Sequence, residues 1–313
     1  MQEFEKLAFD IFNYQSRYNI LYKDYLERLG IKVEHVKHLD EIPFMPIEFF
    51  KSFKVLTGVE DVQLVFQSSG TTGPETSKHF IHDIILYQQS FRKCFELFYG
   101  STESWCILAL LPSYIEREDS SLIRMMKHLT SSNNDPRSGF YLHNISDLAI
   151  NLRQLKKENK KTMLFGVTFA LLDFAEVHGF SFPELTLMET GGMKGRKKEM
   201  VREEVHTVLC KAFGVDQVHS EYGMTELLSQ AYSSGRGIFQ TPPWMKVLIR
   251  DVGDPFSYTN TGITGGLNII DLANLDSCSF IATQDLGKKF EDDSFEVLGR
   301  FDYSDVRGCN LLV

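Results

Sequence analysis

The chain has 313 residues, of which 43% are hydrophobic and 24% charged, a composition typical of an ordinary globular protein. Its formal net charge of -9 at pH 7 leaves no broad basic surface, so we expect no nucleic-acid partner. The N-terminus is charged and no stretch is apolar for long enough to cross a bilayer, so we expect a cytoplasmic protein without a membrane span. Five scattered cysteines without a Cys-x-x-Cys pair argue against a disulfide framework or a structural zinc site.

Residues 1–60 are expected to form a helical lead-in. Apolar residues recur with helical spacing over residues 4–29 and stop at Gly30, which predicts one long helix or two short ones. The next segment, residues 42–51, contains Pro43 and Pro46, which prevent a continuous helix. We expect its aromatic side chains to pack against a neighbouring element.

A polar loop follows directly on the strand-like apolar residues 64–66. Its small and hydroxyl-bearing residues are Ser68, Ser69, Gly70, Thr71, Thr72 and Gly73. Small residues let backbone N–H groups approach a phosphate, and hydroxyls donate further hydrogen bonds, so this segment is predicted to bind phosphate. It is not a Walker A loop, because that motif requires a second glycine five positions after the first, followed by Lys and Ser/Thr, and here Glu75 stands five positions after Gly70.

Strands and helices are predicted to alternate through residues 61–243, which indicates an α/β nucleotide-binding core with a parallel sheet. The expected strands cover residues 105–110, 162–166 and 185–189, and the expected helices lie near residues 83–98, 120–130, 146–157, 169–178 and 195–212. From residue 244 onward, short strands at 246–250, 266–270 and 279–282 predict a β-rich subdomain that extends to residue 313.

Three further motifs follow the loop. Gly191, Gly192 and Met193 connect a predicted strand to a predicted helix, and glycines there let a flat ring or a phosphate lie close to the backbone. An ordinary strand-to-helix turn would have the same residues.

The next motif, at residues 221–226, combines an aromatic ring, a hydroxyl and a carboxylate around Gly223. Tyr222 could stack a base, Thr225 could hold a phosphate, and Glu226 could bind Mg²⁺, which prefers carboxylate and phosphate oxygens. A surface turn leading into a helix is the alternative.

The last motif contains Asp285 and Arg300. Asp285 could accept hydrogen bonds from both ribose hydroxyls, and Arg300 could donate to the ribose or a phosphate. The alternative is an isolated surface ion pair of little energetic value.

In this order the four motifs resemble the signature motifs of the adenylate-forming superfamily, with complete matches to Tyr-Gly-x-Thr-Glu and Gly-Arg-x-Asp. The resemblance implies ATP and Mg²⁺ as cofactors, and a carboxylic acid that is activated as an acyl-AMP. It places the triphosphate on the 68–73 loop and metal on Glu226. The remaining contacts that it implies are Gly191, Gly192, Met193, Tyr222 and Gly223 around the adenine, Thr225 at the α-phosphate, and Asp285 and Arg300 at the ribose.

Within that superfamily, the 42–51 segment, the Gly-Gly turn and the Arg307-Gly308-x-Asn310 ending look like the phenylacetate-CoA ligase and acyl-protein synthetase branches. The CoA ligases carry a further C-terminal domain of about a hundred residues. The sequence ends three residues after Asn310. We therefore expect a large adenylate-forming N-terminal domain that lacks the usual C-terminal lid.

A missing lid favours the acyl-protein synthetase (LuxE-like) branch, in which the resemblance implies transfer of a fatty acyl group to a cysteine near the C-terminus. Cys309 stands at that position, although a cysteine without a role fits the same place. Three questions stay open: whether the acid is fatty or aromatic, whether the acceptor is this cysteine, a reductase-type protein or CoA, and whether a partner supplies the lid. The rivals are an acyl- or aryl-CoA ligase that needs a partner lid and a non-catalytic nucleotide- or acyl-binding protein.

The pair His79 and His82 is interpreted as polar residues at the start of a helix, because no third metal ligand lies in range. Proximity of either histidine to the phosphate loop is the lesser possibility.

Overall fold

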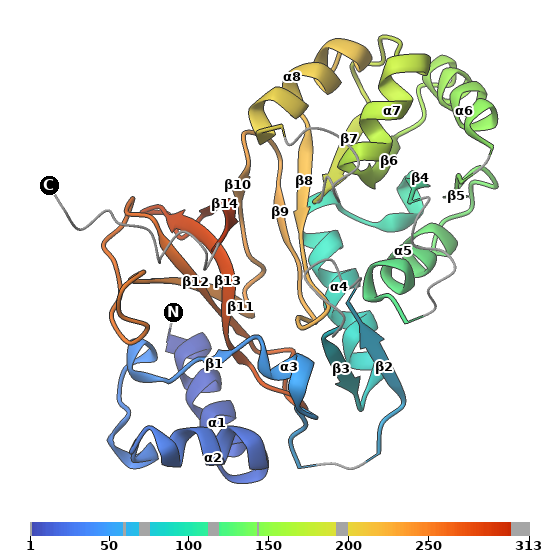
Figure 1. Cartoon of the computed structure of the whole chain (residues 1–313). Coiled ribbons are helices and arrows are strands. Elements are labelled where there is room, and N and C mark those ends of the chain that lie inside the picture. Colours follow the sequence, from blue (N-terminus) through green and yellow to red (C-terminus); the bar gives the residue numbers. More distant parts are fainter. Residues whose placement is uncertain are drawn as a thin grey trace, which may run out of the picture.

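The structure, a computed structural model, describes residues 2–58, 61–68, 76–111, 119–142, 144–191 and 200–301. Two β-sheets lie side by side, each with its own helices (Figure 1). The helices are α1 (Gln2–Tyr18), α2 (Ile20–Arg28), η1 (Val33–His35), η2 (Leu39–Glu41), α3 (Phe49–Ser52), α4 (Ile84–Tyr99), η3 (Thr102–Ser104), α5 (Ser121–Ser131), α6 (Ile145–Lys157), α7 (Thr168–His178) and α8 (Arg202–Phe213).

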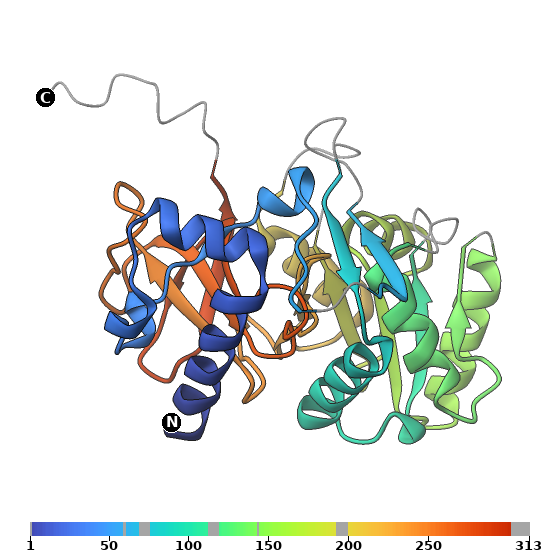
Figure 2. The ribbon, with the colours of Figure 1, turned by 90° about the horizontal axis from the view of Figure 1, so that it is seen from below.

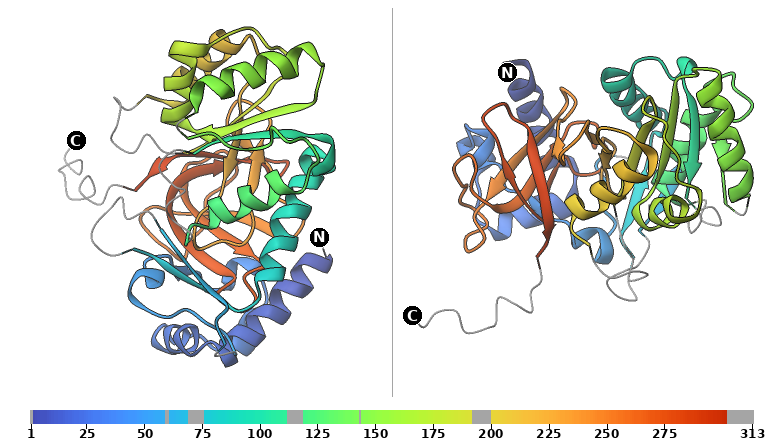
Figure 3. Two further views of the ribbon diagram at one scale, coloured as in Figure 1. Left: turned by 90° about the vertical axis from the view of Figure 1, so that its right-hand side faces the viewer. Right: turned by 90° about the horizontal axis from the view of Figure 1, so that it is seen from above.

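The first sheet is parallel except at one edge, as expected for an α/β core. Its strands lie in the order β5 (Gly139–Phe140), β4 (Cys106–Leu110), β6 (Thr162–Val167), β7 (Thr186–Thr190), β8 (His219–Tyr222) and β9 (Ala231–Ser233), and β9 is antiparallel to β8. Every residue of β4 and β6 is buried, because a parallel sheet is covered on both faces. α4 packs against α5 and α7 against α8, and the two pairs lie on opposite faces of the sheet (Figure 3).

The second sheet is antiparallel and forms the predicted β-rich region. Its strands lie in the order β10 (Ile238–Phe239), β14 (Phe295–Arg300), β13 (Phe280–Lys289), β12 (Gly265–Asp271) and β11 (Met245–Arg250). β1 (Met45–Pro46) adds a short parallel pairing to the start of β13. The sequence segment with two prolines is thus an edge strand, which tolerates proline because one side of the strand has no partner.

A hairpin of β2 (Leu64–Gln67) and β3 (Lys78–Ile81) flanks the phosphate-loop motif and projects beside the two sheets (Figure 2). β3 was not expected, and the interpretation of His79 as part of a helix start is wrong, because this residue lies in the strand. The helix itself begins two residues after His82. There Asp83 accepts hydrogen bonds from the backbone of Ile85 and Leu86 and so caps α4.

The core has two hydrophobic clusters. One surrounds the parallel sheet, and the other joins the N-terminal helices to the antiparallel sheet. Tyr222 ends a strand of the parallel sheet but packs in the second cluster, with its ring edge-on to Phe239 and Phe295. The boundary between the two sheets, named the seam from here on, therefore lies at Tyr222.

The N-terminal helices are two, α1 and α2, and the side chain of Asn19 between them caps the second by accepting from the backbone N–H of Tyr22 at 2.9 Å. The helix expected from residue 195 begins at Arg202 within the described residues. None of the helices described here is both long and apolar enough to span a membrane. The domain boundaries near residues 60 and 243 stay a prediction.

Candidate adenylate-forming site

The motif residues converge where the parallel strands end beside the antiparallel sheet. Ser68 follows β2, Gly191 follows β7, and Tyr222 is the last residue of β8. Asp285 and Arg300 come from the antiparallel sheet, where they are directly opposite each other on β13 and β14. Ligands bind outside the carboxyl ends of the strands in open α/β sheets, so this edge is the expected place for a site.

Tyr222, Asp285 and Arg300 form one hydrogen-bonded cluster across the seam. The Tyr222 hydroxyl donates to Asp285 Oδ2 at 2.7 Å, and Arg300 Nε donates to Asp285 Oδ1 at 3.2 Å. The Asp285 side chain is 11% exposed, whereas that of Arg300 is 55% exposed. Arg300 is therefore held by one N–H while the rest of its guanidinium faces solvent.

Burial raises the pKa of the Tyr222 hydroxyl well above its usual range, and the charge of Asp285 raises it further. The phenol consequently stays protonated and donates at every physiological pH. The Asp285 carboxylate therefore accepts from two donors, the neutral Tyr222 hydroxyl and the charged Arg300 guanidinium, and these two bonds fix its orientation.

The following turn, residues 224–227, is closed by the Leu227 N–H, which donates to the Met224 carbonyl at 3.2 Å. It carries Thr225 and the buried Glu226. Burial raises the pKa of Glu226, while a hydrogen bond with the Ser77 side chain and the charge of Arg300 lower it, and the charge of Asp285 raises it. Glu226 therefore lies in electrostatic range of both charged members of the cluster.

Residues from distant parts of the chain hold this turn in place. Asn274 Nδ2 donates to the Glu226 carbonyl at 2.8 Å. The buried carboxylate of Asp271 accepts from the backbone N–H groups of Leu228 and Ser229, both at 2.9 Å. On the other side, His79 Nδ1 lies 2.9 Å from the Thr225 carbonyl oxygen. Neither Asn274 nor Asp271 was assigned to the site from the sequence, whereas proximity of His79 to the phosphate loop was the lesser possibility stated for it.

The stem of the phosphate-loop motif is also fixed. The Ser68 N–H donates to the Ser77 carbonyl at 3.0 Å, and the Ser77 N–H donates to Ser68 Oγ at 2.9 Å. The loop residues Ser69, Gly70, Thr71, Thr72 and Gly73 lie outside the described residues, as do Gly192, Met193 and Cys309. Their predicted contacts stay predictions.

The two described glycines of the motifs differ in their surroundings. No described atom lies within 4 Å of a Cβ added to Gly191, so none of the described residues blocks a flat ring beside this backbone. A Cβ on Gly223 would stand 2.4 Å from Glu221 Oε1, the far end of a flexible side chain. Glycine at residue 223 therefore makes room for the buried Glu221 carboxylate.

Two further buried carboxylates lie at the ends of β7 and β8. Burial raises the pKa of Glu221 to about 7, partly offset by the hydrogen bond that the Thr190 hydroxyl donates at 2.5 Å. Burial also raises the pKa of Glu189, but His206 and Arg202 outweigh it and leave that pKa lowered. Motif spacing alone gave no role to either residue.

Arg202 joins the two sheets behind the glycine turn. Its Nε lies 3.7 Å from Glu189 Oε1, its Nη1 donates to the Val297 carbonyl of β14 at 2.9 Å, and its guanidinium lies over the Phe239 ring. This contact ties the parallel sheet to the strand that ends in Arg300.

The described residues contain no group of three or more His, Cys, Asp or Glu side chains that could hold a metal by themselves. Glu226 offers one carboxylate. Mg²⁺ keeps several waters and usually takes one or two carboxylates together with substrate phosphates, so one buried glutamate beside a phosphate-loop stem fits that mode.

A scan of protein-family models and a search of curated proteins find no match to this sequence. Solved structures do match its fold. The ATP-bound MatB from Rhodopseudomonas palustris is 15% identical with a TM-score of 0.57, over 78% of this chain and 49% of that chain. The present chain thus spans about half of the length of MatB.

A 2-hydroxyisobutyryl-CoA ligase in complex with 2-HIB-AMP and CoA is 14% identical with a TM-score of 0.68, over 96% of this chain and 68% of that chain. The luciferase-like enzyme from the mealworm Zophobas morio is 18% identical with a TM-score of 0.51, over 79% and 59% of the two chains. The fold predicted from the four motifs is confirmed: the chain has the α/β fold of the large N-terminal domain of adenylate-forming enzymes.

Proposed function

We propose that the protein is an adenylate-forming ligase that couples ATP to a carboxylic acid. The observation that carries the proposal is the Tyr222/Asp285/Arg300 cluster, which is built across the seam at the ends of the parallel strands. A buried carboxylate with one exposed arginine partner suits a ribose, because carboxylate oxygens can accept from two adjacent hydroxyls. The solved neighbours that bind ATP or an acyl-AMP share this fold and support the same interpretation.

Each residue has a proposed task. Asp285 and Arg300 hold the ribose, Tyr222 keeps Asp285 in place, and the open backbone at Gly191 admits the adenine. Thr225 steadies the α-phosphate, and Glu226 binds Mg²⁺, which neutralises phosphate charge when it is bound. The acid carboxylate attacks the α-phosphorus and pyrophosphate leaves, so that positioning and charge neutralisation supply most of the rate.

The finer proposal is an acyl-protein synthetase that acts on a long-chain fatty acid, with an aromatic acid as the second candidate. A thiolate attacks the acyl carbonyl of the acyl-AMP, AMP leaves, and a thioester forms. Cys309 is the proposed thiol, and a reductase-type protein is the proposed final acceptor. This part rests on the sequence motifs, because Cys309 lies outside the described residues.

The first test is pyrophosphate exchange across aliphatic and aromatic acids with ATP and Mg²⁺. Exchange that depends on an acid supports adenylation. ATP binding without exchange, and without hydroxamate formation in the presence of hydroxylamine, would instead indicate a non-catalytic nucleotide-binding protein.

The second test follows label from tetradecanoate onto the protein. Cys309→Ser should lose the label, and Cys210→Ser is the matched control, because Cys210 is the only partly exposed cysteine among the described ones. Label that survives in Cys309→Ser contradicts the cysteine step. Acyl-CoA that forms only after a partner protein is added would favour the CoA-ligase alternative.

A further inference from the structure

His79 lies on β3, next to the stem of the phosphate-loop motif, and its side chain is completely buried. The strand is anchored to β2 throughout its length, from Lys78 opposite Gln67 to Ile81 opposite Leu64. A side chain on this strand is therefore held at a fixed position relative to the loop stem.

Two residues of this segment reach the 224–227 turn from the same face. Side chains two positions apart on a strand point to the same side. The Ser77 side chain lies close enough to Glu226 to help lower the pKa of its carboxyl, and His79 Nδ1 lies 2.9 Å from the Thr225 carbonyl oxygen. Together they join the loop stem to the two residues proposed to act on the α-phosphate and the metal.

The tautomer of His79 follows from its partner. A carbonyl oxygen only accepts, so the hydrogen must be on Nδ1. Burial lowers the pKa of His79 to about 4, so the ring is neutral and Nε2 carries a lone pair. Nε2 has no hydrogen-bond partner among the described residues, and the Phe50 ring packs edge-on against the imidazole at 5.4 Å between centroids.

The opposite side of the turn is held by other residues. Asn274 fixes the Glu226 carbonyl, and Asp271 fixes the backbone of Leu228 and Ser229. Those contacts lie at and after Glu226, whereas the His79 contact lies before it. Among the contacts described, the one between the His79 imidazole and the Thr225 carbonyl thus fixes the position of Thr225 relative to the loop stem.

We propose that His79 is a positioning residue: its neutral imidazole donates from Nδ1 to the Thr225 carbonyl and holds the 224–227 turn against the phosphate-loop stem, so that Mg·ATP meets both in one geometry. The inference rests on the proposed function, since it concerns how the same site is held. His79 itself touches no reacting atom.

Three variants separate the hydrogen bond from packing. His79→Asn keeps an N–H donor at the place of Nδ1 but lacks the far ring atoms Cε1 and Nε2, of which Nε2 has no described partner. His79→Leu fills similar volume but leaves the Thr225 carbonyl unpaired. His82→Leu is the matched control, because His82 Nδ1 makes the same kind of contact, at 2.7 Å to the Asp61 carbonyl, away from the turn.

We expect His79→Leu to weaken Mg·ATP binding about tenfold, since a buried carbonyl loses its donor, and His79→Asn and His82→Leu to stay within about twofold of wild type. Binding is measured by calorimetry with Mg·ATP, and the KM of the acid should not change in any variant. Equal weakening in His79→Asn and His79→Leu would overturn the inference, as would normal binding in His79→Leu.

The tautomer supplies a test that needs no activity. Nitrogen-15 NMR of the wild-type protein labelled at histidine, with His79→Asn to assign the signal, should show a neutral ring protonated at Nδ1 at pH 7. A ring protonated at Nε2 would overturn the inference even in an active protein. Failure of the proposed function looks different: no pyrophosphate exchange with any acid, while the tautomer is still Nδ1–H.

Discussion

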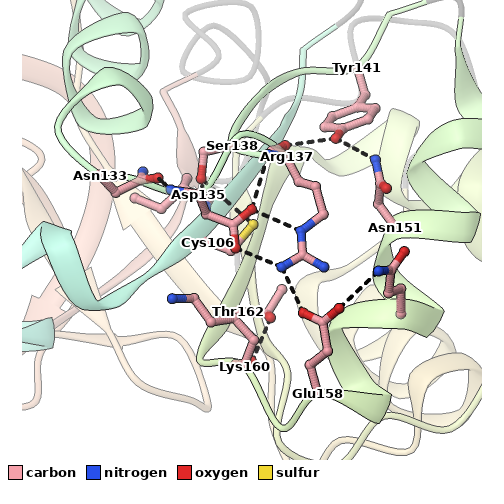
Figure 4. Close-up of polar contacts among 12 residues, drawn as sticks. Cys106, Asn133, Asp135, Arg137, Ser138, Tyr141, Asn151, Glu158, Lys160 and Thr162 are labelled. Atoms are coloured by element: carbon pink, nitrogen blue, oxygen red, sulfur yellow. Dashed lines mark hydrogen bonds and ion pairs between the residues drawn. The ribbon is translucent and has the colours of Figure 1, made fainter.

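Two arginines of this protein are paired with carboxylates in opposite ways. Arg137 lies between Asp135 and Glu158 near the β5 edge of the parallel sheet (Figure 4). Its Nε and Nη2 donate to the two oxygens of Asp135 at 2.8 and 2.7 Å, and Nη2 lies 2.8 Å from Glu158 Oε2. Among the described residues, Arg300 by contrast has one polar contact, of 3.2 Å to Asp285, and its side chain is 55% exposed.

The difference shows which of the two clusters is free to bind something else. The bidentate pair with Asp135 takes up Nε and Nη2 of Arg137, and two carboxylates neutralise its charge, which favours a structural task. A cavity of about 370 Å³ lies beside this cluster, lined among others by Arg137, Tyr141 and Asn151. Tyr141 and Asn151 are already bonded to each other at 2.8 Å, so volume alone does not indicate the site of chemistry. The Arg300 guanidinium keeps donors available for a ligand.

The largest effect is expected from Asp285→Asn. The amide keeps the shape and still accepts from Tyr222, but it loses the charge that Arg300 and ribose hydroxyls require. We expect kcat/KM for ATP to fall about 100-fold, because charge-assisted hydrogen bonds contribute roughly 1.5–3 kcal/mol each. Asp254→Asn is the matched control, since Asp254 accepts from Ser257 in an exposed turn of the same sheet. An unchanged kcat/KM in Asp285→Asn would remove the cluster from the proposed site.

Arg137→Leu tests the other half of the comparison. We expect the free energy of unfolding to drop by about 2 kcal/mol at pH 7, while the KM for ATP stays unchanged. The hydrogen bond with Arg137 is the main cause that lowers the pKa of Asp135 to about 2, from its ordinary value of 3.8. A lowered carboxyl pKa stabilises the fold above the ordinary value, and this contribution is lost as the pH falls towards 2.

The urea-unfolding difference between wild type and Arg137→Leu should therefore be largest at pH 7 and shrink below pH 4. A variant that unfolds normally but binds ATP poorly would reverse the assignment of the two arginines.

The fold was largely predictable from the sequence, because long buried runs such as β4 and β6 belong to parallel sheets and because the motifs follow strands. The pairings across the seam were not. Tyr222 and Asp285 are 63 residues apart, and His79 and Thr225 are 146 apart, so no local pattern joins them. β3 was missed because four residues beginning with Lys78-His79 resemble a polar turn more than a strand, and its pairing with β2 decides its conformation.

Of the candidate site, the motif residues are what the sequence predicts. Tyr222, Asp285 and Arg300 are hydrogen-bonded to one another, while the ligand contacts that the resemblance implies for them stay predictions. The residues that hold the motifs, such as Asp271 and Asn274, bond to backbone groups, and a backbone partner leaves no trace in the sequence. A buried polar residue between apolar ones, as at Asn268 and Asp271, is the signal that could have pointed to them.

Asp135 and Asp285 are each paired with an arginine, whereas the groups that shift the pKa of a third carboxylate, Glu221, include no cation. Its raised pKa means that the folded state binds a proton more tightly than the unfolded state. Wild-type stability should thus fall as the pH rises from about 4.5 to 7 and level off above, relative to Glu221→Gln, whose amide still accepts from Thr190. The expected difference at pH 8 is on the order of 2 kcal/mol in favour of the variant. Thermal unfolding from pH 5 to 8 measures it, and parallel curves for the two proteins would contradict the protonated state.

The smallest effect is expected from Arg300→Lys. An exposed ion pair contributes about 0–1 kcal/mol to stability, so the melting temperature should stay as it is. Lysine keeps the positive charge near Asp285 but lacks the fork that could contact the carboxylate and a ligand together. We expect the KM for ATP to rise about fivefold with little change in kcat, whereas Arg137→Lys should alter stability and leave the KM alone. A loss in Arg300→Lys as large as that in Asp285→Asn would mean that the guanidinium acts on the reacting phosphate and not on the ribose.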